Sequence, residues 1–325
     1  MAHKIVLVSG AGGFIGRWSV PRLIAGGYQV HAVLGRAAGG AAGRELPVQL
    51  RGAEIHRTDL LDAEAVRALM ALVKPSHLLH FAWIATPGLY WTSLDNRRWL
   101  SASQHLLQCF HDHGGVRAVM AGSSAEYDWS RVGVCDERSS PLADDAGVAI
   151  TPYAECKIAM QKALEHFGSA HQLSTAWGRI FFQFGPDEHP DRLVASVIVN
   201  LLSGREAPSS HGRQIRSFLH VADVGSAFAA LLDSDTTGAV NIGSGVPVSI
   251  AELLEKIALQ IGRPELLRLG ARTASPSEPP LLVPAVDRLC GEVGWRPHFS
   301  LTDGVADTIG WWRTKLADGS NETNR

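Results

Sequence analysis

Short apolar runs alternate with longer amphipathic stretches through the first half of the chain. Runs rich in Val, Ile and Leu that end at glycine or polar residues are typical of buried strands. Such runs predict strands within residues 4–10, 28–35, 53–60, 76–83, 116–124 and 173–182. The stretches between them predict helices at residues 14–27, 64–73, 96–114 and 152–168. This alternation favours a parallel sheet covered by helices on both faces.

After residue 180 the alternation becomes irregular, which indicates a second, smaller region. Residues 238–245 again have the pattern of a strand, and we expect this strand to return to the first sheet. The predicted fold is therefore α/β, with a doubly wound parallel sheet and a smaller C-terminal α+β region.

Composition and charge narrow the function classes. The 325 residues are 46% hydrophobic and 19% charged, and the formal net charge is -2. This balance gives no general electrostatic reason to bind nucleic acid or an acidic membrane surface. No apolar run approaches the roughly 20 residues that span a bilayer, and the apolar run at the N-terminus ends in glycines. We expect a cytoplasmic protein without nucleic-acid or membrane partners.

The cysteine and histidine residues predict neither disulfides nor a metal site. Cys109, Cys135, Cys156 and Cys290 lie far apart and form no C-x-x-C motif. The histidines of "HDH" at 111–113 are two residues apart, so on a helix they point to different sides.

A glycine-rich turn separates the first predicted strand from the first helix. "GAGGFIG" places Gly10, Gly13 and Gly16 around Phe14 and Ile15 in the spacing G-x-x-G-x-x-G. A tight turn and a close approach of backbone to a pyrophosphate exclude Cβ atoms, and the helix N-terminus offers free N–H groups to phosphate. The motif predicts a Rossmann-type site for a dinucleotide.

The residues around this turn favour NADP over NAD. NAD sites usually carry an acidic residue at the end of the second strand, where this chain has Gly35 and Arg36. Arg17 follows the last glycine, and one or both guanidinium groups would suit a 2′-phosphate. If both arginines are merely solvated, NAD remains the alternative. Asp59, followed by Leu60, is either an acceptor for the adenine amino group or the N-cap of the next helix.

Tyr153 and Lys157 lie one helical turn apart in "TPYAECKIA". Taken alone, this pair is more readily explained as one stripe of an ordinary helix. The surrounding motifs change its interpretation. The chain carries, in order, "GAGGFIG", "HRTDL", "LLHFAW", "AGSSAEYD", "YAECK", "GRIFFQFGP", "RQIRSFLHVADV", "VNIGSG" and "VGWRPHFSLTDGV". It resembles the extended short-chain dehydrogenases/reductases, and more narrowly the NAD-dependent epimerase/dehydratase family that acts on nucleotide-diphosphate sugars.

The resemblance covers nearly the whole chain and implies roles for its residues. Tyr153 would exchange a proton with a sugar oxygen as hydride moves to or from the nicotinamide. Lys157 would supply a positive charge that favours the phenolate, and would hold the nicotinamide ribose. Ser124 matches the Ser/Thr that bonds the reacting oxygen, and Ser123 precedes it at the strand end. Ala82 would pass its backbone close to the cofactor.

The resemblance also implies a substrate site in the second half of the chain. Arg216 matches the arginine that grips the nucleotide diphosphate, and Arg192 would assist; the alternative for both is a surface arginine. We expect the cofactor within residues 1–180, with 217–245 returning to that domain. The nucleotide sugar would bind to 181–216 and 246–325. A homodimer is expected from the family.

Three departures from the family pattern bear on the reaction. Glu126 is present as a candidate base for elimination, but Ala125 replaces its acidic partner. Phe182 stands where many members have a diphosphate-binding Asn, which leaves Gln183 as a possible substitute. Ser217 replaces the Asp of "RDF".

These features rank an NADPH-dependent reductase of a 4-keto(-6-deoxy) sugar nucleotide first. A 4-epimerase that retains NAD is second, and a 4,6-dehydratase is third. A non-catalytic dinucleotide-binding protein is the alternative of another class, but such proteins often lose the Tyr or Lys that this chain keeps.

Overall fold

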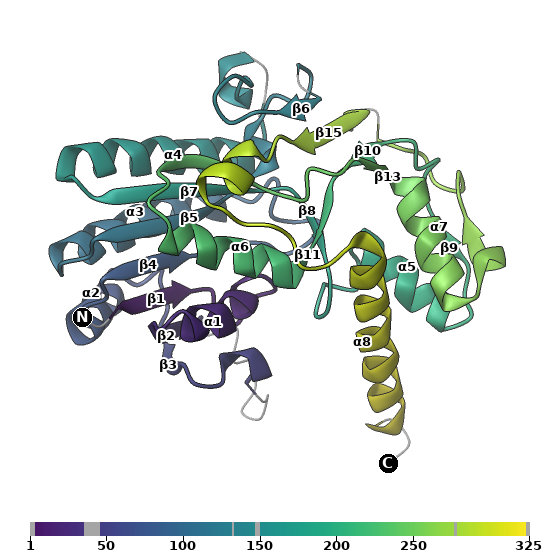
Figure 1. The fold of residues 1–325 in the computed structure, drawn as a ribbon, viewed down its shortest axis with the longest axis horizontal. Coiled ribbons are helices and arrows are strands. Elements are labelled where there is room, and N and C mark those ends of the chain that lie inside the picture. Colours follow the sequence, from purple (N-terminus) through teal and green to yellow (C-terminus); the bar gives the residue numbers. More distant parts are fainter. Residues whose placement is uncertain (1–3, 36–45, 132, 147–149, 276–277, 323–325) are drawn as a thin grey trace.

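A parallel sheet of seven strands forms the larger part of the molecule (Figure 1). The computed structural model describes residues 4–35, 46–131, 133–146, 150–275 and 278–322. The strand order is β12-β7-β5-β4-β1-β2-β3, and every neighbouring pair is parallel. The strands are β1 (Ile5–Ser9), β2 (Gln29–Leu34), β3 (Glu54–Arg57), β4 (His77–His80), β5 (Arg117–Ser123), β7 (Ser174–Ile180) and β12 (Gly238–Ile242). The predicted Rossmann-type α/β fold is confirmed.

Helices cover both faces of this sheet. One face carries α1 (Gly16–Ala25) and α6 (Val221–Asp233), and the other carries α2 (Ala63–Val73), α3 (Asp95–Asp112) and α4 (Pro152–His171). Successive side chains of a strand point to opposite faces, so Val6 and Val8 join the core beneath α1 and α6. Leu7 joins the other core, beneath α2 and α3. Both faces are therefore apolar, which explains the continuous hydrophobic runs in the sequence.

A smaller region lies beside one end of the sheet (Figure 1). Its helices α5 (Leu193–Leu202), α7 (Ile250–Ile261) and α8 (Leu301–Glu322) share a core that includes Phe184, Ile198, Leu254 and Ile309. Its short strands are β6 (Val134–Cys135), β8 (Phe182–Phe184), β9 (Ala207–Pro208), β10 (Ile215–Arg216), β11 (Phe218–His220), β13 (Val248–Ser249), β14 (Leu267–Arg268) and β15 (Leu281–Pro284). They form one four-stranded sheet and two separate pairs, β8 with β11 and β9 with β14.

The carboxyl ends of the large sheet's strands meet the residues singled out in the sequence. β1 leads into the glycine turn, β4 leads toward Ala82, and β5 ends at Ser123. Ligands of open parallel sheets bind at this edge.

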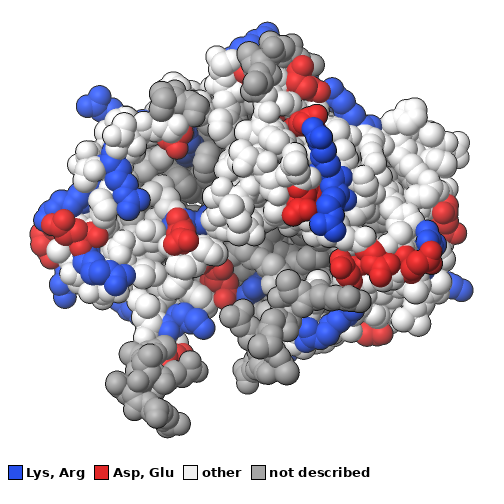
Figure 2. All heavy atoms as spheres, turned by 180° about the vertical axis from the view of Figure 1, so that it is seen from behind, with Lys and Arg blue, Asp and Glu red and all other residues white. Residues whose placement is uncertain are grey.

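Charged side chains are interspersed over the surface. On the face shown in Figure 2, acidic and basic residues alternate without a large area of one sign, in keeping with the small net charge. Within the described ranges, no helix has both the length and the hydropathy needed to cross a membrane.

Candidate active site

The glycine turn is packed so tightly that side chains would not fit. Gly10 has a φ of +66°, and a Cβ atom there would lie 2.8 Å from the backbone N of Ala82. A Cβ on Gly16 would overlap the carbonyl of Gly10. Among the described residues, the N–H groups of Phe14 and Ile15 take no backbone partner, and α1 begins without a side-chain cap. The turn therefore offers free N–H groups at a helix N-terminus, which suits a dinucleotide phosphate.

Arg17 does not lie free to bind a 2′-phosphate, contrary to the prediction. Its Nε and Nη2 donate to the carbonyls of Gly13 at 3.0 Å and Gly12 at 2.7 Å. Its Nη1 forms an ion pair of 2.6 Å with Asp187, in the segment that follows β8. The guanidinium group is thus occupied by the chain itself. Arg36, the other predicted contact, lies outside the described residues.

Asp59 is not the cap of α2. Its Oδ1 accepts a hydrogen bond from the N–H of Leu61 at 3.0 Å, while Asp62 accepts from two N–H groups at the start of the helix. The alternative interpretation of Asp59 as an N-cap is therefore wrong. Asp59 lies half-buried beside the buried Leu60, just after β3. The contacts that we predicted between the cofactor and the residues Asp59 and Leu60 remain predictions.

Tyr153 and Lys157 occupy the first turns of α4, which Thr151 caps at its N-terminus. Lys157 is 4% exposed, and its Nζ donates to the carbonyl of Ala121 at 2.8 Å. The Nζ lies 3.9 Å from the ring centre of Trp83 and 5.9 Å from that of Tyr153. Burial lowers the pKa of Lys157 to about 7. The structure thus places the ammonium group near the phenol ring.

Ser123, rather than Ser124, contacts the phenol. The Tyr153 side chain shares a hydrogen bond with Ser123, and burial raises the pKa of Tyr153 although this bond partly lowers it. A short 3₁₀ helix, η3 (Ser124–Glu126), begins directly after Ser123 and buries the Ser124 side chain. The Ser124 carbonyl accepts from Trp129 Nε1 at 2.9 Å. The contact with the reacting oxygen that the resemblance implied for Ser124 stays a prediction.

Glu126 is sequestered in the core. It is fully buried, and Arg179 donates to it from Nε at 2.8 Å. Trp177 Nε1 and the N–H of Ser123 donate to the same carboxylate. A base for elimination needs a free oxygen facing the substrate. These contacts contradict the predicted catalytic role of Glu126 and favour a structural one.

Aromatic side chains that the sequence analysis did not single out surround Tyr153. The rings of Tyr90 and Trp91 lie edge-on to it, with centroids 4.9 and 5.5 Å away. The Trp91 ring also contacts Trp129 at 6.0 Å, and the Trp91 carbonyl accepts from the N–H of Tyr153 at 3.3 Å. For Tyr90 and Trp91 the available signal was the density of aromatic residues in "LYWTSLDNRRW", which leads into α3. We call Tyr90, Trp91 and Trp129 the aromatic wall.

Asn96 holds the segment that carries this wall. Its side chain is fully buried at the start of α3 and accepts from Trp83 Nε1 at 2.8 Å. Its amide donates to the carbonyls of Tyr90 at 2.7 Å and Ser93 at 2.8 Å. Because Trp83 also contacts the Lys157 ammonium, one network joins Tyr90 to α4.

The predicted substrate residues lie in different places. Arg216 is buried, with its guanidinium 5.3 Å from the ring centre of Phe182. Gln183 follows Phe182 in β8 and so points to the opposite side of the strand, which argues against its predicted substitution for the missing Asn. Arg192 lies 5.9 Å from the Tyr90 ring centre and shares a hydrogen bond with its hydroxyl. Arg192 is therefore the predicted arginine that lies near the aromatic wall.

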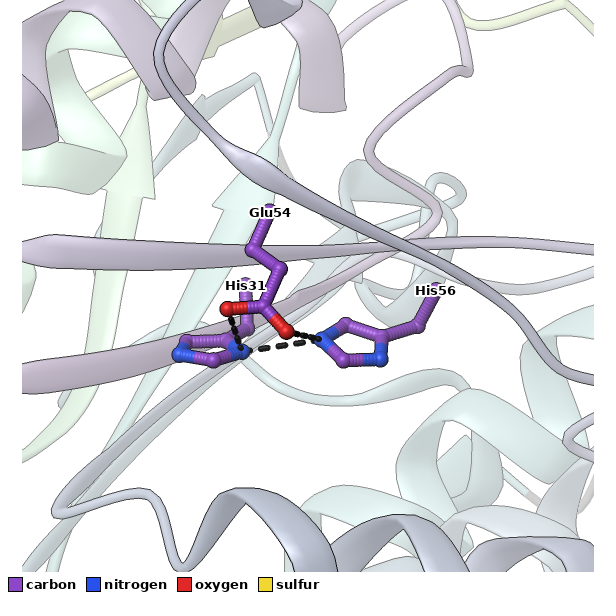
Figure 3. A group of neighbouring side chains, drawn as sticks. All are labelled: His31, Glu54 and His56. Carbon is purple, nitrogen blue, oxygen red and sulfur yellow. Dashed lines mark hydrogen bonds and ion pairs between the residues drawn. The ribbon is translucent and has the colours of Figure 1, made fainter.

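His31, Glu54 and His56 form a cluster on β2 and β3 (Figure 3). His31 Nδ1 lies 2.8 Å from His56 Nε2. Glu54 Oε2 lies 3.7 Å from His31 Nδ1, and Glu54 Oε1 lies 3.7 Å from His56 Nε2. Two nitrogens on a tetrahedral zinc ion are about 3.3 Å apart, so the shorter spacing describes a hydrogen bond between the two rings. Burial lowers the pKa of His31 and so favours its neutral form. The sequence analysis missed this cluster because its histidines lie on different strands.

Comparisons with known proteins place this site in a family. The sequence matches the NAD dependent epimerase/dehydratase family over residues 6–243. The chain belongs to this family. It is therefore an enzyme, and the resemblance seen in the sequence is confirmed. It belongs to the nucleotide-sugar-modifying enzymes of this family.

Individual relatives of this epimerase/dehydratase family member differ in activity. The chain is 30% identical to dTDP-4-dehydro-6-deoxy-D-allose reductase of Streptomyces bikiniensis, over 96% of this chain and 97% of that protein. It is 25% identical to UDP-glucose 4-epimerase of Bacillus subtilis (strain 168), over 94% and 96%. Its fold matches that of UDP-glucose 4-epimerase of Thermotoga maritima with a TM-score of 0.82 and 21% identity, over 96% and 99% of the two chains.

Proposed function

We propose that the protein is an NADPH-dependent reductase of a nucleotide-linked 4-keto sugar, most suitably a 4-keto-6-deoxy sugar. One observation supports this proposal: the Tyr153 phenol can donate the proton that a reduction needs, whereas Glu126, the base predicted for an elimination, is bound within the core. Tyr153 is a phenol with a raised pKa at the carboxyl edge of the sheet. Glu126 is held by Arg179 and Trp177 in the core.

The residues of the chain would supply the proton that the reduction needs and stabilise the group that loses it. The bound cofactor supplies hydride to the carbonyl carbon. Tyr153 then gives its proton to the carbonyl oxygen, and its raised pKa keeps that proton in place beforehand. Lys157 stabilises the phenolate that remains, because its ammonium lies near the ring. Ser123 orients the phenol through their shared hydrogen bond.

The relatives support reduction of a sugar nucleotide. Two dTDP-4-dehydro-6-deoxy-D-allose reductases are 30% identical to this chain, compared with 25% for the epimerase of Bacillus subtilis. The choice of NADPH rests on Gly35, which follows β2 where an acidic residue would favour NAD. Arg17 no longer supports that choice, since it is bound to Asp187.

The two regions of the molecule would divide the ligands. We assign the cofactor to residues 1–180 with 217–245, and the nucleotide sugar to 181–216 and 246–325. Arg216 would grip the diphosphate and Arg192 would assist. The proposal includes a cytoplasmic homodimer, as the resemblance implies.

A 4-epimerase is the second candidate. The observation that favours it is the Arg17–Asp187 pair, which removes one expected ligand of a 2′-phosphate and so weakens the case for NADP. An epimerase keeps NAD and returns the hydride to the same carbon.

Mass spectrometry separates these reactions. The protein is incubated with nucleotide sugars and with their 4-keto derivatives, with NADPH, with NADH and without added cofactor. Reduction adds two hydrogens to the keto substrate and requires added cofactor, which is the expected result. A product of unchanged mass and new retention time, formed without added cofactor, would overturn the proposal in favour of epimerisation.

A further inference from the structure

The aromatic wall offers mostly carbon to a ligand beside Tyr153. Tyr90, Trp91 and Trp129 are each half-buried, so none of the three residues is sealed in the core. The indole N–H of Trp129 already donates to the Ser124 carbonyl, and the Tyr90 hydroxyl already shares a hydrogen bond with Arg192. The polar atoms of two of the three side chains are therefore occupied, and their ring surfaces remain for contact.

The position of the wall is fixed before any ligand binds. Asn96 is fully buried and donates to the Tyr90 and Ser93 carbonyls at 2.7 and 2.8 Å. The Trp91 carbonyl accepts from the N–H of Tyr153 itself. Tyr90 and Trp91 are thus tied by hydrogen bonds to α3 and to the backbone of Tyr153. A preorganised apolar surface discriminates between ligands more strongly than a mobile one.

The chemistry of a hexose limits what can lie against this wall. If Tyr153 contacts the oxygen on C4, the neighbouring groups are the hydroxyl on C3 and the C6 substituent on C5. A hydroxyl placed against ring carbon loses its hydrogen bonds to water and gains none. A methyl group placed there gains contact without that loss. The C6 group is therefore the one that suits the wall, provided that it carries no oxygen.

We propose that Tyr90, Trp91 and Trp129 form a subsite for the C6 methyl group of a 6-deoxy sugar and select against a C6 hydroxymethyl group. This inference rests on the proposed function for the placement of C4 at Tyr153. It assigns specificity to residues outside the catalytic couple.

A pair of ligands that differ in a single oxygen tests the subsite. The affinities of dTDP-glucose and dTDP-6-deoxyglucose are measured by calorimetry with the holoprotein in the presence of NADP⁺, and the uridine-linked pair is measured in the same way. We expect the 6-deoxy ligand to bind about 10- to 100-fold more tightly, since apolar pockets discriminate against an added hydroxyl by about 10² at most. Equal affinities, or tighter binding of the glucose ligand, would overturn the proposal.

Two replacements of Trp91 sharpen the test. Trp91→Phe keeps an aromatic ring, so the preference should persist. Trp91→Gln offers an amide to the C6 hydroxyl, so the preference should fall at least 5-fold, within the roughly 10- to 100-fold range available. Trp311→Gln makes the same change on α8, where Trp311 contacts Trp312, and should leave the preference unchanged. Near-ultraviolet circular dichroism confirms that each variant is folded. An unchanged preference in folded Trp91→Gln would refute the role of Trp91.

Failure of the subsite and failure of the proposed reaction give different results. A protein that prefers the 6-deoxy ligand but adds no hydrogen to a 4-keto substrate keeps the subsite and loses the reductase assignment. A protein that reduces the keto substrate but binds both ligands equally keeps the reductase assignment and loses the subsite.

Discussion

The catalytic couple and the aromatic wall come from regions of contrasting structure. Tyr153 and Lys157 lie on one regular helix, and Ser123 ends a central strand of the large sheet. Tyr90, Trp91 and Trp129 lie in irregular segments that meet only through the fold. Under the proposed function, periodic structure would position the proton chemistry, whereas irregular connections would shape the surface that meets the sugar.

The largest effect is expected from the hydroxyl of Tyr153. Tyr153→Phe removes the proton donor and keeps the ring packing, so turnover of a 4-keto substrate should fall about 10²- to 10⁴-fold. Cofactor binding, measured by calorimetry, should be unchanged. Tyr28→Phe makes the same replacement at a hydroxyl bonded to Asp233 and should keep full activity. Wild-type turnover in folded Tyr153→Phe would contradict the assigned role.

The next largest effect concerns stability. Arg179→Met leaves the carboxylate of Glu126 buried without its cation, which should lower the free energy of unfolding by about 3–5 kcal/mol. Urea unfolding measures this loss. Adding Glu126→Gln removes the buried charge and should restore part of the stability. If the double variant keeps activity on a 4-keto substrate, Glu126 is structural; a specific loss of turnover in stable protein would return it to the reaction.

Acid should weaken the core of the large sheet. His80 bonds Ser9 and Ser103, and burial lowers its pKa to about 3. Its unfolded pKa is near 6.5, so the stabilisation is present above that value and is lost as the pH falls toward 3. At pH 5 the loss is about 2 kcal/mol relative to pH 7. Urea midpoints at the two pH values measure it.

The control for this pH dependence is His80→Asn, which removes the titrating group at the same place. Its stability should change less between pH 7 and pH 5 than that of the wild type. An equal change in both proteins would assign the acid sensitivity to other groups, among them His31 and His77, whose pKa values burial also lowers.

The smallest expected effect is on the pH profile of the free enzyme. Lys157 has a pKa of about 7, so it loses its charge as the pH rises through that value. The phenolate of Tyr153 then lacks its cation, and kcat/KM should decline about 10-fold per pH unit on the alkaline side. Lys157→Arg keeps a cation at every accessible pH. Its rate should be lower but flat between pH 6 and pH 9; a persistent alkaline decline would assign that limb to another group.

The sequence predicts what depends on local spacing. Apolar runs identified the strands because both faces of the sheet are buried. The spacing of the glycines predicted a turn in which two backbone segments pack closely. The structure shows this close packing between Gly10 and Ala82. Tyr153 and Lys157 could be paired because one helical turn separates them.

Contacts between distant segments could not be predicted in the same way. Glu126 and Arg179 are 53 residues apart, and only the register of β5 beside β7 brings their carboxylate and guanidinium groups together. Arg17 and Asp187 are 170 residues apart, so the ion pair between them could not be recognised from the sequence. The aromatic wall likewise depends on Asn96, whose buried amide fixes a segment without periodic structure.

Under the proposed function, the Arg17–Asp187 pair would link the preferences of the enzyme for its two ligands. Arg17 binds the carbonyls of the glycine turn, and Asp187 belongs to the segment that leads to Arg192. A mutation of Arg17 would break this ion pair and release the segment, to which the proposal assigns the nucleotide sugar. In an evolving or engineered lineage the two preferences would therefore change together, and a successful cofactor swap would need a compensating change at Asp187.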